Sequence, residues 1–294
     1  MNILITGASS GFGALMVGDL IKAGHRVVGS VRDPGGRNAE AAQSLRDLGA
    51  EIVEIDVTDD ASVEAGVSEA QALLGKIDVL INNAGVGSHG LQENFSADEF
   101  RSLFEINFFG VQRMIRAVLP EMRERSSGLI LNISSLLGRV VLPFYGPYNA
   151  TKWALEAMTE NYRVELSQLG VDVAVIEPGG FPTRFLGSLM HPASPDRDEG
   201  YGELAGAPSA SLAGFSEFLE ANPQQSPQLV SDAVVSVVSA APGTRPFRTV
   251  VDRVGMGDLV DPMNAQLGEA TAQLFTNLGM ADMLKLKLDA QKAA

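Results

Sequence analysis

Short apolar segments alternate with longer stretches of helical periodicity through the first 180 residues of this 294-residue chain. Each apolar segment is nearly continuous and ends at Gly, Asn, Asp or Pro, as strands buried on both faces of a parallel sheet do. Since parallel strands need crossover helices between them, the pattern predicts an α/β fold, a doubly wound parallel sheet in three α/β/α layers. The expected strands are Asn2–Thr6, Arg26–Val31, Glu51–Asp56, Val79–Asn82, Gly128–Ser134 and Val171–Glu177.

Several of the intervening helices have recognisable ends. The run Ala14–Ala23 stops at Gly24, a residue type common just past a helix. Ser96 with Glu99 three residues later is typical of a capping box, and apolar residues from 100 to 115 then predict one long helix.

The chain changes character after Pro178. Residues 179–228 are dense in Gly, Pro, Ser and Ala, which predicts an irregular insertion, either a lid or a disordered excursion, with a substrate loop at about 184–228. A helix over 229–241 and a strand at Arg248–Val251 then complete a single domain, residues 1–252. Residues 253–294 predict a helical extension with an apolar face to bury.

Charge and composition exclude several classes of function. The 22 basic and 36 acidic residues give a net charge of −14, which repels nucleic acid and anionic membrane surfaces. There is no cysteine, and His25, His89 and His191 lack ligand spacing, so no metal site is expected. No apolar run approaches membrane-spanning length and no signal peptide is apparent, so we expect a cytoplasmic protein without a membrane partner.

A glycine-rich turn joins the first strand to the first helix, with the sequence Thr6-Gly-Ala-Ser-Ser-Gly-Phe-Gly13. Gly7 permits a sharp turn, Gly11 lets backbone approach a pyrophosphate, and Gly13 brings the helix close to the sheet. A ligand-free turn is the alternative. The place of the glycine-rich turn in the first strand–helix connection favours a Rossmann-type dinucleotide site.

Three further strand ends carry candidate nucleotide contacts. The second strand ends without an acidic residue and is followed by Arg32, which suits the 2′-phosphate of NADP(H), with Ser9 or Ser30 assisting, rather than the free hydroxyl of NAD(H). A surface arginine in a turn with Asp33 is the alternative. Asp56 and Asn83 follow the next two strands and could contact adenine and hold the turn, or only cap local backbone.

The residues that carry the chemistry come later. Tyr148 and Lys152 are four apart in a helical run, so the ammonium can lie near the phenol and lower its pKa, which makes Tyr148 a general acid or base. Ser135, rather than Ser134, could donate to the substrate oxygen. Asn107 lies inside an apolar helix, where it satisfies backbone at a kink or anchors a water linked to Lys152.

In this order, the motifs resemble the classical short-chain dehydrogenase/reductase family. The matching positions are Thr6–Gly13, Asp56, Asn82–Gly85, Asn107, Ser135, Tyr148-x-x-x-Lys152, Pro178-Gly179 and Thr183. The resemblance implies that Tyr148 exchanges the substrate proton, that Lys152 lowers its pKa and binds the nicotinamide ribose, that Ser135 polarises the carbonyl and that Asn107 completes a proton relay.

The resemblance also supplies the rest of the expected site. Thr183 would hold the carboxamide, although Pro182 beside it departs from the family pattern. The remaining cofactor contacts would come from Ser10, Phe12, Val57, Ala84, Gly85, Pro178, Gly179 and Phe181. A homodimer or homotetramer is implied as well, because relatives pair through the helices that hold Asn107 and Tyr148.

We therefore expect hydride transfer between NADP(H) and a carbonyl or alcohol substrate. Alternatives are an NAD-dependent alcohol dehydrogenase, a sugar-nucleotide epimerase or dehydratase, and a non-catalytic nucleotide sensor. The expected substrate lining is apolar and aromatic, and consists of Leu137, Val140, Phe144, Tyr145, Phe181, Phe185, Leu189, Met190 and Phe215 or Phe218.

Overall fold

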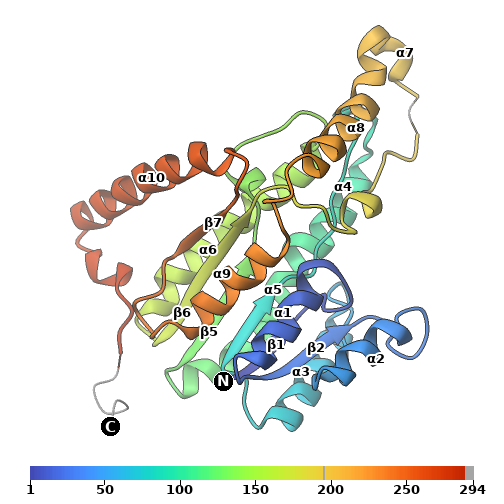
Figure 1. Ribbon diagram of the computed structural model, residues 1–294. Coiled ribbons are helices and arrows are strands. Elements are labelled where there is room, and N and C mark those ends of the chain that lie inside the picture. Colours follow the sequence, from blue (N-terminus) through green and yellow to red (C-terminus); the bar gives the residue numbers. More distant parts are fainter. Residues whose placement is uncertain (195, 289–294) are drawn as a thin grey trace.

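The computed structural model describes residues 1–194 and 196–288, and a parallel seven-stranded sheet forms its centre (Figure 1). The strand order is β3-β2-β1-β4-β5-β6-β7, which confirms the predicted doubly wound sheet. The strands are β1 (Asn2–Ile5), β2 (Arg26–Val31), β3 (Glu51–Glu54), β4 (Val79–Asn82), β5 (Gly128–Ile133), β6 (Val171–Pro178) and β7 (Arg248–Val251). Three of them end one or two residues before the predicted position, where the loops begin.

Two hydrophobic cores cover the two faces of the sheet. Because successive strand residues point to opposite faces, Ile3 and Ile5 of β1 enter one core and Leu4 enters the other. The first core lies beneath α1 (Gly11–Lys22), α2 (Ala39–Asp47) and α9 (Gln228–Ser239), and the second beneath α3 (Asp60–Leu74), α5 (Gly110–Glu124) and α6 (Gly146–Ser167). The packing of helices on both faces of the sheet holds in place the strand ends at which the candidate site residues lie.

The long helix predicted after Ser96 is interrupted by a π-helical segment. The capping box is confirmed, since the Ser96 side chain accepts from the Glu99 backbone and the Glu99 carboxylate accepts from the Ser96 N–H. It opens α4 (Ala97–Phe104), which continues through a π-helical turn, Glu105–Phe109, directly into α5. Such turns insert one extra residue and often occur at functional sites, and this one carries Asn107.

The insertion after β6 is more regular than predicted. The expectation of an irregular segment over 179–228 is wrong for its second half, which forms α7 (Asp198–Tyr201), a 3-10 turn and α8 (Ala207–Glu220). Small Ala and Ser residues give this stretch no clear helical periodicity in the sequence. They are nevertheless compatible with a helix, and Phe215 of α8 packs against Gly180. In Figure 1, α7 and α8 lie at the same end of the molecule as α4.

Of the extension predicted over 253–294, residues 289–294 lie outside the described part of the chain; the rest contains the helix α10 (Gly257–Asn277), which does not bury the expected apolar face. Val260 is fully buried, whereas Leu259, Leu267, Leu274 and Leu278 are between 49% and 69% exposed. The helix is held by polar contacts instead, described below. None of the helices within the described residues has the length and apolar character that a bilayer crossing requires.

Candidate active site

One cavity of about 1320 Å³ lies at the carboxyl ends of the strands, over the point where β1 and β4 adjoin. In doubly wound sheets this switch point is where ligands bind. The cavity brings together nearly all of the predicted catalytic and cofactor-binding residues, and of these only Gly13 and Asn107 do not line it. The predicted residues in its lining are Gly7, Ser9, Ser10, Gly11, Phe12, Arg32, Asp56, Val57, Asn83, Ala84, Gly85, Ser135, Tyr148, Lys152, Pro178, Gly179, Phe181 and Thr183.

The glycine turn has the geometry of an anion site. Gly11 opens onto the cavity, since the nearest heavy atom to a Cβ there would be the Thr183 Cβ at 4.0 Å. Gly13 lies behind it, where a Cβ would meet the Gly7 carbonyl oxygen at 2.2 Å. No side chain caps α1 at Ser10, so the first N–H groups of the helix are available to a diphosphate. The turn therefore fits a dinucleotide.

Asn83 ties this turn to the neighbouring strand. Its side-chain Nδ2 donates to the Thr6 and Gly7 carbonyl oxygens at 2.9 and 3.0 Å. In return, the Thr6 hydroxyl accepts from the backbone N–H groups of Asn83 and Ala84, each at 3.0 Å. Asn83 thus holds the turn backbone beside the nucleotide cavity, one of the two roles expected from the sequence.

Two arginines lie at the adenine end of the cavity, and sequence reasoning found only one. Arg32 and Arg37 both line it. Asp33 makes the predicted turn, but its carboxylate accepts from the Arg37 backbone N–H at 2.9 Å, and within the described residues Arg32 forms no ion pair. The missed signal was the Asp33-Pro34-Gly35-Gly36 sequence, whose turn chemistry brings Arg37 back toward Arg32.

Asp56 lies close to these two cations. Burial raises the pKa of its carboxyl, but hydrogen bonds from the Thr58 backbone and hydroxyl, together with the charges of Arg32 and Arg37, hold it below the usual range. Asp56 therefore stays ionised beside the arginines, with one carboxylate oxygen already engaged by Thr58.

Tyr148 and Lys152 lie together on the inner face of α6 and are nearly buried, at 7% and 6% exposure. The Lys152 Nζ lies 5.7 Å from the Tyr148 ring centroid and donates to the Ile133 carbonyl oxygen at 2.9 Å. The Ser135 hydroxyl hydrogen-bonds to the Tyr148 phenol. Ser135 thus lies against Tyr148, whereas Ser134 faces Gly138; the role of Ser135 stays a prediction.

The expected lowering of the Tyr148 pKa by Lys152 is not seen. Burial raises the pKa of Tyr148 to about 12, and the Ser135 hydrogen bond offsets only part of that rise. The ammonium is bound to backbone and lies over the ring, so the cost of desolvating a phenolate outweighs its attraction. The Tyr148 phenol is accordingly protonated at neutral pH.

Asn107 supports this group from behind. Its Oδ1 accepts from the Val86 N–H at 2.9 Å, while its Nδ2 donates to the Val86 carbonyl at 2.8 Å and to the Thr151 hydroxyl at 3.0 Å. Asn107 therefore satisfies backbone groups at a helix irregularity, the π-helical turn, which is one of the two roles suggested by the sequence. A Cβ on Gly85 would come within 3.9 Å of the Lys152 Nζ, so this network borders the lysine.

The segment after β6 closes the cavity opposite α6. The Phe181 and Phe12 rings meet edge to face at 5.5 Å, which joins this segment to the glycine turn. The Thr183 hydroxyl accepts from the Phe185 N–H at 3.3 Å. Pro182 is exposed and lines the cavity without disturbing these contacts.

The substrate end of the cavity is apolar, but its lining differs in part from the prediction. Leu137, Phe144, Tyr145, Phe181, Phe185 and Phe215 line it as expected. Val140, Leu189, Met190 and Phe218 do not. The first three pack into a cluster behind the cavity, and Phe218 is 42% exposed. Lining residues that the sequence analysis did not predict include Leu142, Pro143, Leu186, Ser188, Ser211, Met256 and the charged Arg184.

Comparison with known proteins places this arrangement among the nicotinamide-dependent oxidoreductases. The model of the short chain dehydrogenase family matches residues 1–193, and the chain belongs to that family. A 3-ketodihydrosphingosine reductase of Bacteroides thetaiotaomicron is 40% identical over 62% of this chain, which spans 65% of that relative's length. Human retinol dehydrogenase 8 is 35% identical over an alignment that covers 83% of this chain and 78% of that relative's length.

Solved structures agree with this assignment. A short-chain dehydrogenase from Streptomyces avermitilis superposes with a TM-score of 0.73 at 30% identity, covering 94% of this chain and 97% of that one. A Burkholderia phymatum relative in complex with NAD (TM-score 0.72, 26% identity, 85% and 88% coverage) is also similar. So is an actinorhodin polyketide ketoreductase with NADPH (TM-score 0.71, 26% identity, 87% and 97% coverage). Neighbours of this fold thus bind either nicotinamide cofactor.

Proposed function

We propose that this chain is an NADP(H)-dependent oxidoreductase that interconverts a carbonyl group and an alcohol on an apolar or aromatic small molecule. The observation that carries the proposal is the shared cavity. Tyr148, Lys152 and Ser135 line it together with the glycine turn, so a nucleotide and a substrate oxygen can meet at one phenol.

The side chains divide the work as follows. A bound nicotinamide supplies or accepts the hydride. In the reducing direction the neutral Tyr148 phenol donates its proton to the substrate oxygen, and the Ser135 hydroxyl stabilises the negative charge that develops there. Lys152 stabilises the phenolate left behind, and Asn107 fixes the π-helical turn beside it. The apolar walls exclude water from this step.

Two cations support the preference for NADP(H). Arg32 and Arg37 are exposed at the adenine end and could bind a 2′-phosphate. Arg32→Ala is expected to raise the KM for NADPH about 10- to 100-fold, the loss of one charge-assisted hydrogen bond, and to leave that for NADH nearly unchanged. Steady-state kinetics with both cofactors measure this, with the exposed Arg46→Ala as control. Equal NADPH performance in Arg32→Ala would favour an NAD-dependent enzyme.

The aromatic lining supports an apolar substrate. The names of the two relatives given above refer to retinol and to 3-ketodihydrosphingosine, and both of these molecules have long hydrocarbon parts. We expect kcat/KM to be at least about tenfold higher for aromatic and long-chain aldehydes or ketones than for small charged ketoacids. Phe215→Ala, which opens the wall over Gly180, should raise the KM of the best apolar substrate several-fold.

Glu217→Ala is the matched control, because Glu217 is exposed on the same helix outside the cavity, whereas the Phe218 ring stacks on Phe215. A preference for charged ketoacids would contradict the substrate class. A protein that binds NADPH but turns over no carbonyl in the panel would instead be a nucleotide sensor.

We also propose a homodimer or homotetramer, with residues 1–252 as the catalytic domain and 184–228 as the substrate loop. Trp153 of α6 and Phe109 of the π-helical turn support the assembly. They are 46% and 44% exposed, on the helices that hold Tyr148 and Asn107. A cytoplasmic location remains a prediction from the sequence.

A further inference from the structure

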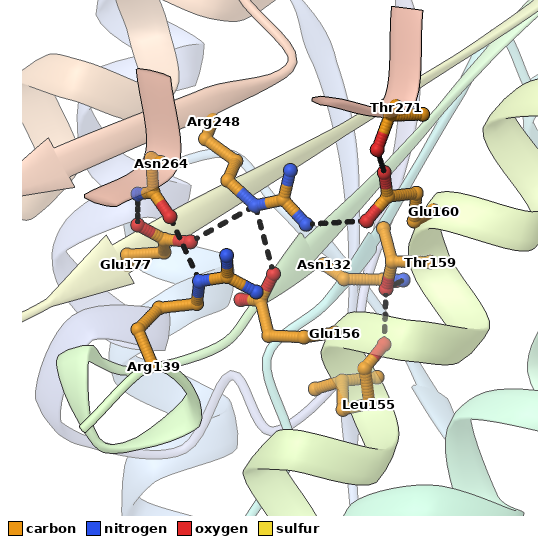
Figure 2. Close-up of polar contacts among 10 residues, drawn as sticks. All are labelled: Asn132, Arg139, Leu155, Glu156, Thr159, Glu160, Glu177, Arg248, Asn264 and Thr271. Carbon is orange, nitrogen blue, oxygen red and sulfur yellow. Dashed lines mark hydrogen bonds and ion pairs between the residues drawn. The ribbon is translucent and has the colours of Figure 1, made fainter. Parts of the chain in front are cut away.

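A buried group of charged side chains lies where α6, β6, β7 and the loop after β5 meet (Figure 2). Arg139, Glu156 and Glu177 are buried, and the Arg248 side chain is only 9% exposed. The proposed reaction uses none of these four residues, here called the ionic cluster. Because burying a charge costs several kcal/mol unless it is well paired, their arrangement calls for an explanation.

Arg248 is shared by the two buried carboxylates. Its Nε lies 3.2 Å from the Glu156 Oε2 and 3.3 Å from the Glu177 Oε1. Its Nη2 lies 3.0 Å from the Glu160 Oε2, one turn further along α6. One guanidinium thus joins β7 to both the catalytic helix and the strand that leads to Pro178.

The C-terminal helix completes the cluster through one amide. The Asn264 Oδ1 accepts from the Arg139 Nε at 2.8 Å, and its Nδ2 donates to the Glu177 Oε2 at 2.6 Å (Figure 2). Only a side chain with both an acceptor and a donor can bridge a cation to an anion in this way. Lower on the same helix, Thr271 donates to the Glu160 Oε1 at 3.3 Å.

Three of the four members of the ionic cluster adjoin a residue of the proposed active site. Glu156 lies one helical turn after Lys152, on the same face of α6. Arg139 follows the short 3-10 turn that begins after Ser135, and Glu177 directly precedes Pro178. These elements are tightly packed, since a Cβ on Gly138 would lie 3.0 Å from the Glu156 Cγ and 3.1 Å from the Lys152 carbonyl oxygen.

The electrostatics connect the cluster to Lys152. Burial lowers the pKa of Lys152 to about 8, and the Glu156 carboxylate opposes that fall. Burial and the nearby Glu156 charge raise the pKa of Glu177 to about 7, against the hydrogen bond from Asn264 and the charges of Arg248 and Arg139. The Glu156 charge in the cluster therefore favours the ammonium form of Lys152.

We propose that the ionic cluster is a positioning device for Lys152. Glu156 holds the lysine as an ammonium, and Asn264 keeps Glu177 ionised and the C-terminal helix attached. The inference rests on the proposed function, because it matters for catalysis only if Lys152 supports Tyr148. It makes the C-terminal helix part of the active-site support although no residue of that helix lines the cavity.

Other titratable and charged groups lie near Lys152 and the ionic cluster. Tyr145 and Tyr148 lie on the cavity side, and burial raises both of their pKa values, so they stay neutral. Glu160 faces Arg248 from α6, and Arg163 lies over the Phe247 ring next to Arg248. The Glu156 carboxylate is the charge that acts most directly on the pKa of Lys152.

The test measures the pKa of Lys152 directly. The chain has six lysines, so 13C-labelled lysine gives few signals, and Lys152→Met identifies the one that matters. Glu156→Gln is expected to lower the Lys152 pKa by about one unit. The alkaline limb of the kcat profile should move to lower pH by the same amount, because the ammonium then loses its proton earlier, while the KM of the carbonyl substrate stays constant.

Asn264→Leu should shift the Lys152 pKa in the same direction but by less. Without the Asn264 donor, Glu177 takes up a proton at neutral pH, and the cluster loses one negative charge at a greater distance from the lysine. Gln266→Leu is the matched control, because Gln266 is exposed on the same helix outside the cluster. If Glu156→Gln does not fold, the comparison of the Lys152 pKa in Asn264→Leu and in Gln266→Leu tests the proposal instead.

An unchanged Lys152 pKa in folded Glu156→Gln, or equal behaviour of Asn264→Leu and Gln266→Leu, would overturn the proposal. Failure of the proposed function is a separate outcome. In that case the wild-type protein turns over no carbonyl with either cofactor, while the lysine titration still reports whether the cluster acts on Lys152.

Discussion

Tyr148→Phe is expected to lower kcat by about 10²- to 10⁴-fold, the usual contribution of a positioned proton donor. The phenol is buried at the meeting point of Ser135 and Lys152, and a benzene ring leaves the substrate oxygen without an acid. NADPH affinity should change little, because the glycine turn and the adenine end are untouched. Single-turnover kinetics at the reduced-nicotinamide band and fluorescence titration of the cofactor measure the two quantities.

Tyr162→Phe is the matched control for this result. Tyr162 lies on the same helix, where its hydroxyl donates to Gln112 away from the cavity, so its loss should leave kcat unaltered. Turnover in Tyr148→Phe equal to that of the wild type would refute the proposed proton transfer. A parallel loss of cofactor affinity would show instead that the substitution disturbs the nucleotide site.

Gly13→Ala is expected to weaken NADPH binding by at least about tenfold and to destabilise the fold by about 1–3 kcal/mol. The new methyl group would lie 2.2 Å from the Gly7 carbonyl oxygen and 2.8 Å from the Asn83 Nδ2. Relief requires the turn to move away from α1, which takes the helix N–H groups out of line with a diphosphate. Calorimetric titration with NADPH and thermal unfolding measure the two effects.

Gly18→Ala provides the comparison within the same helix. A Cβ at Gly18 would meet only the Leu48 Cδ1, at 3.6 Å, which is ordinary contact. Alanine also favours a helix over glycine by about 1 kcal/mol, so this variant should keep its cofactor affinity and gain stability. Similar NADPH affinities in the two variants would mean that the close approach at Gly13 is not what shapes the nucleotide site.

The sequence predicts the sheet and the catalytic face well because both depend on local patterns. Continuous apolar runs identify buried parallel strands, and the spacing of four between Tyr148 and Lys152 fixes their common helix face. The π-helical turn at Asn107 was not predictable, since it depends on the partners Val86 and Thr151, far apart in the sequence. The raised pKa of Tyr148 is not predictable for a related reason: the spacing gives the proximity of a charge but not the depth of burial.

The substrate end and the C-terminal helix show the limit of pattern reasoning. Aromatic residues in a loop face a cavity or pack behind it according to the course of the backbone, so Phe215 and Phe218 could not be distinguished. On α10 the apolar stripe suggested burial, yet the helix is attached through Asn264 and Thr271. A single amide that bridges Arg139 and Glu177 leaves no periodic signal in a sequence.

The late position of Arg248 in the chain has a consequence for biosynthesis. Glu156 and Glu177 emerge from the ribosome well before β7, and until residue 248 is available these acidic groups lack the guanidinium that they share. Domains generally fold as units while synthesis proceeds from the N-terminus. The buried ion pairs that join α6 and β6 to the last strand can therefore form only after nearly the whole domain has been synthesised.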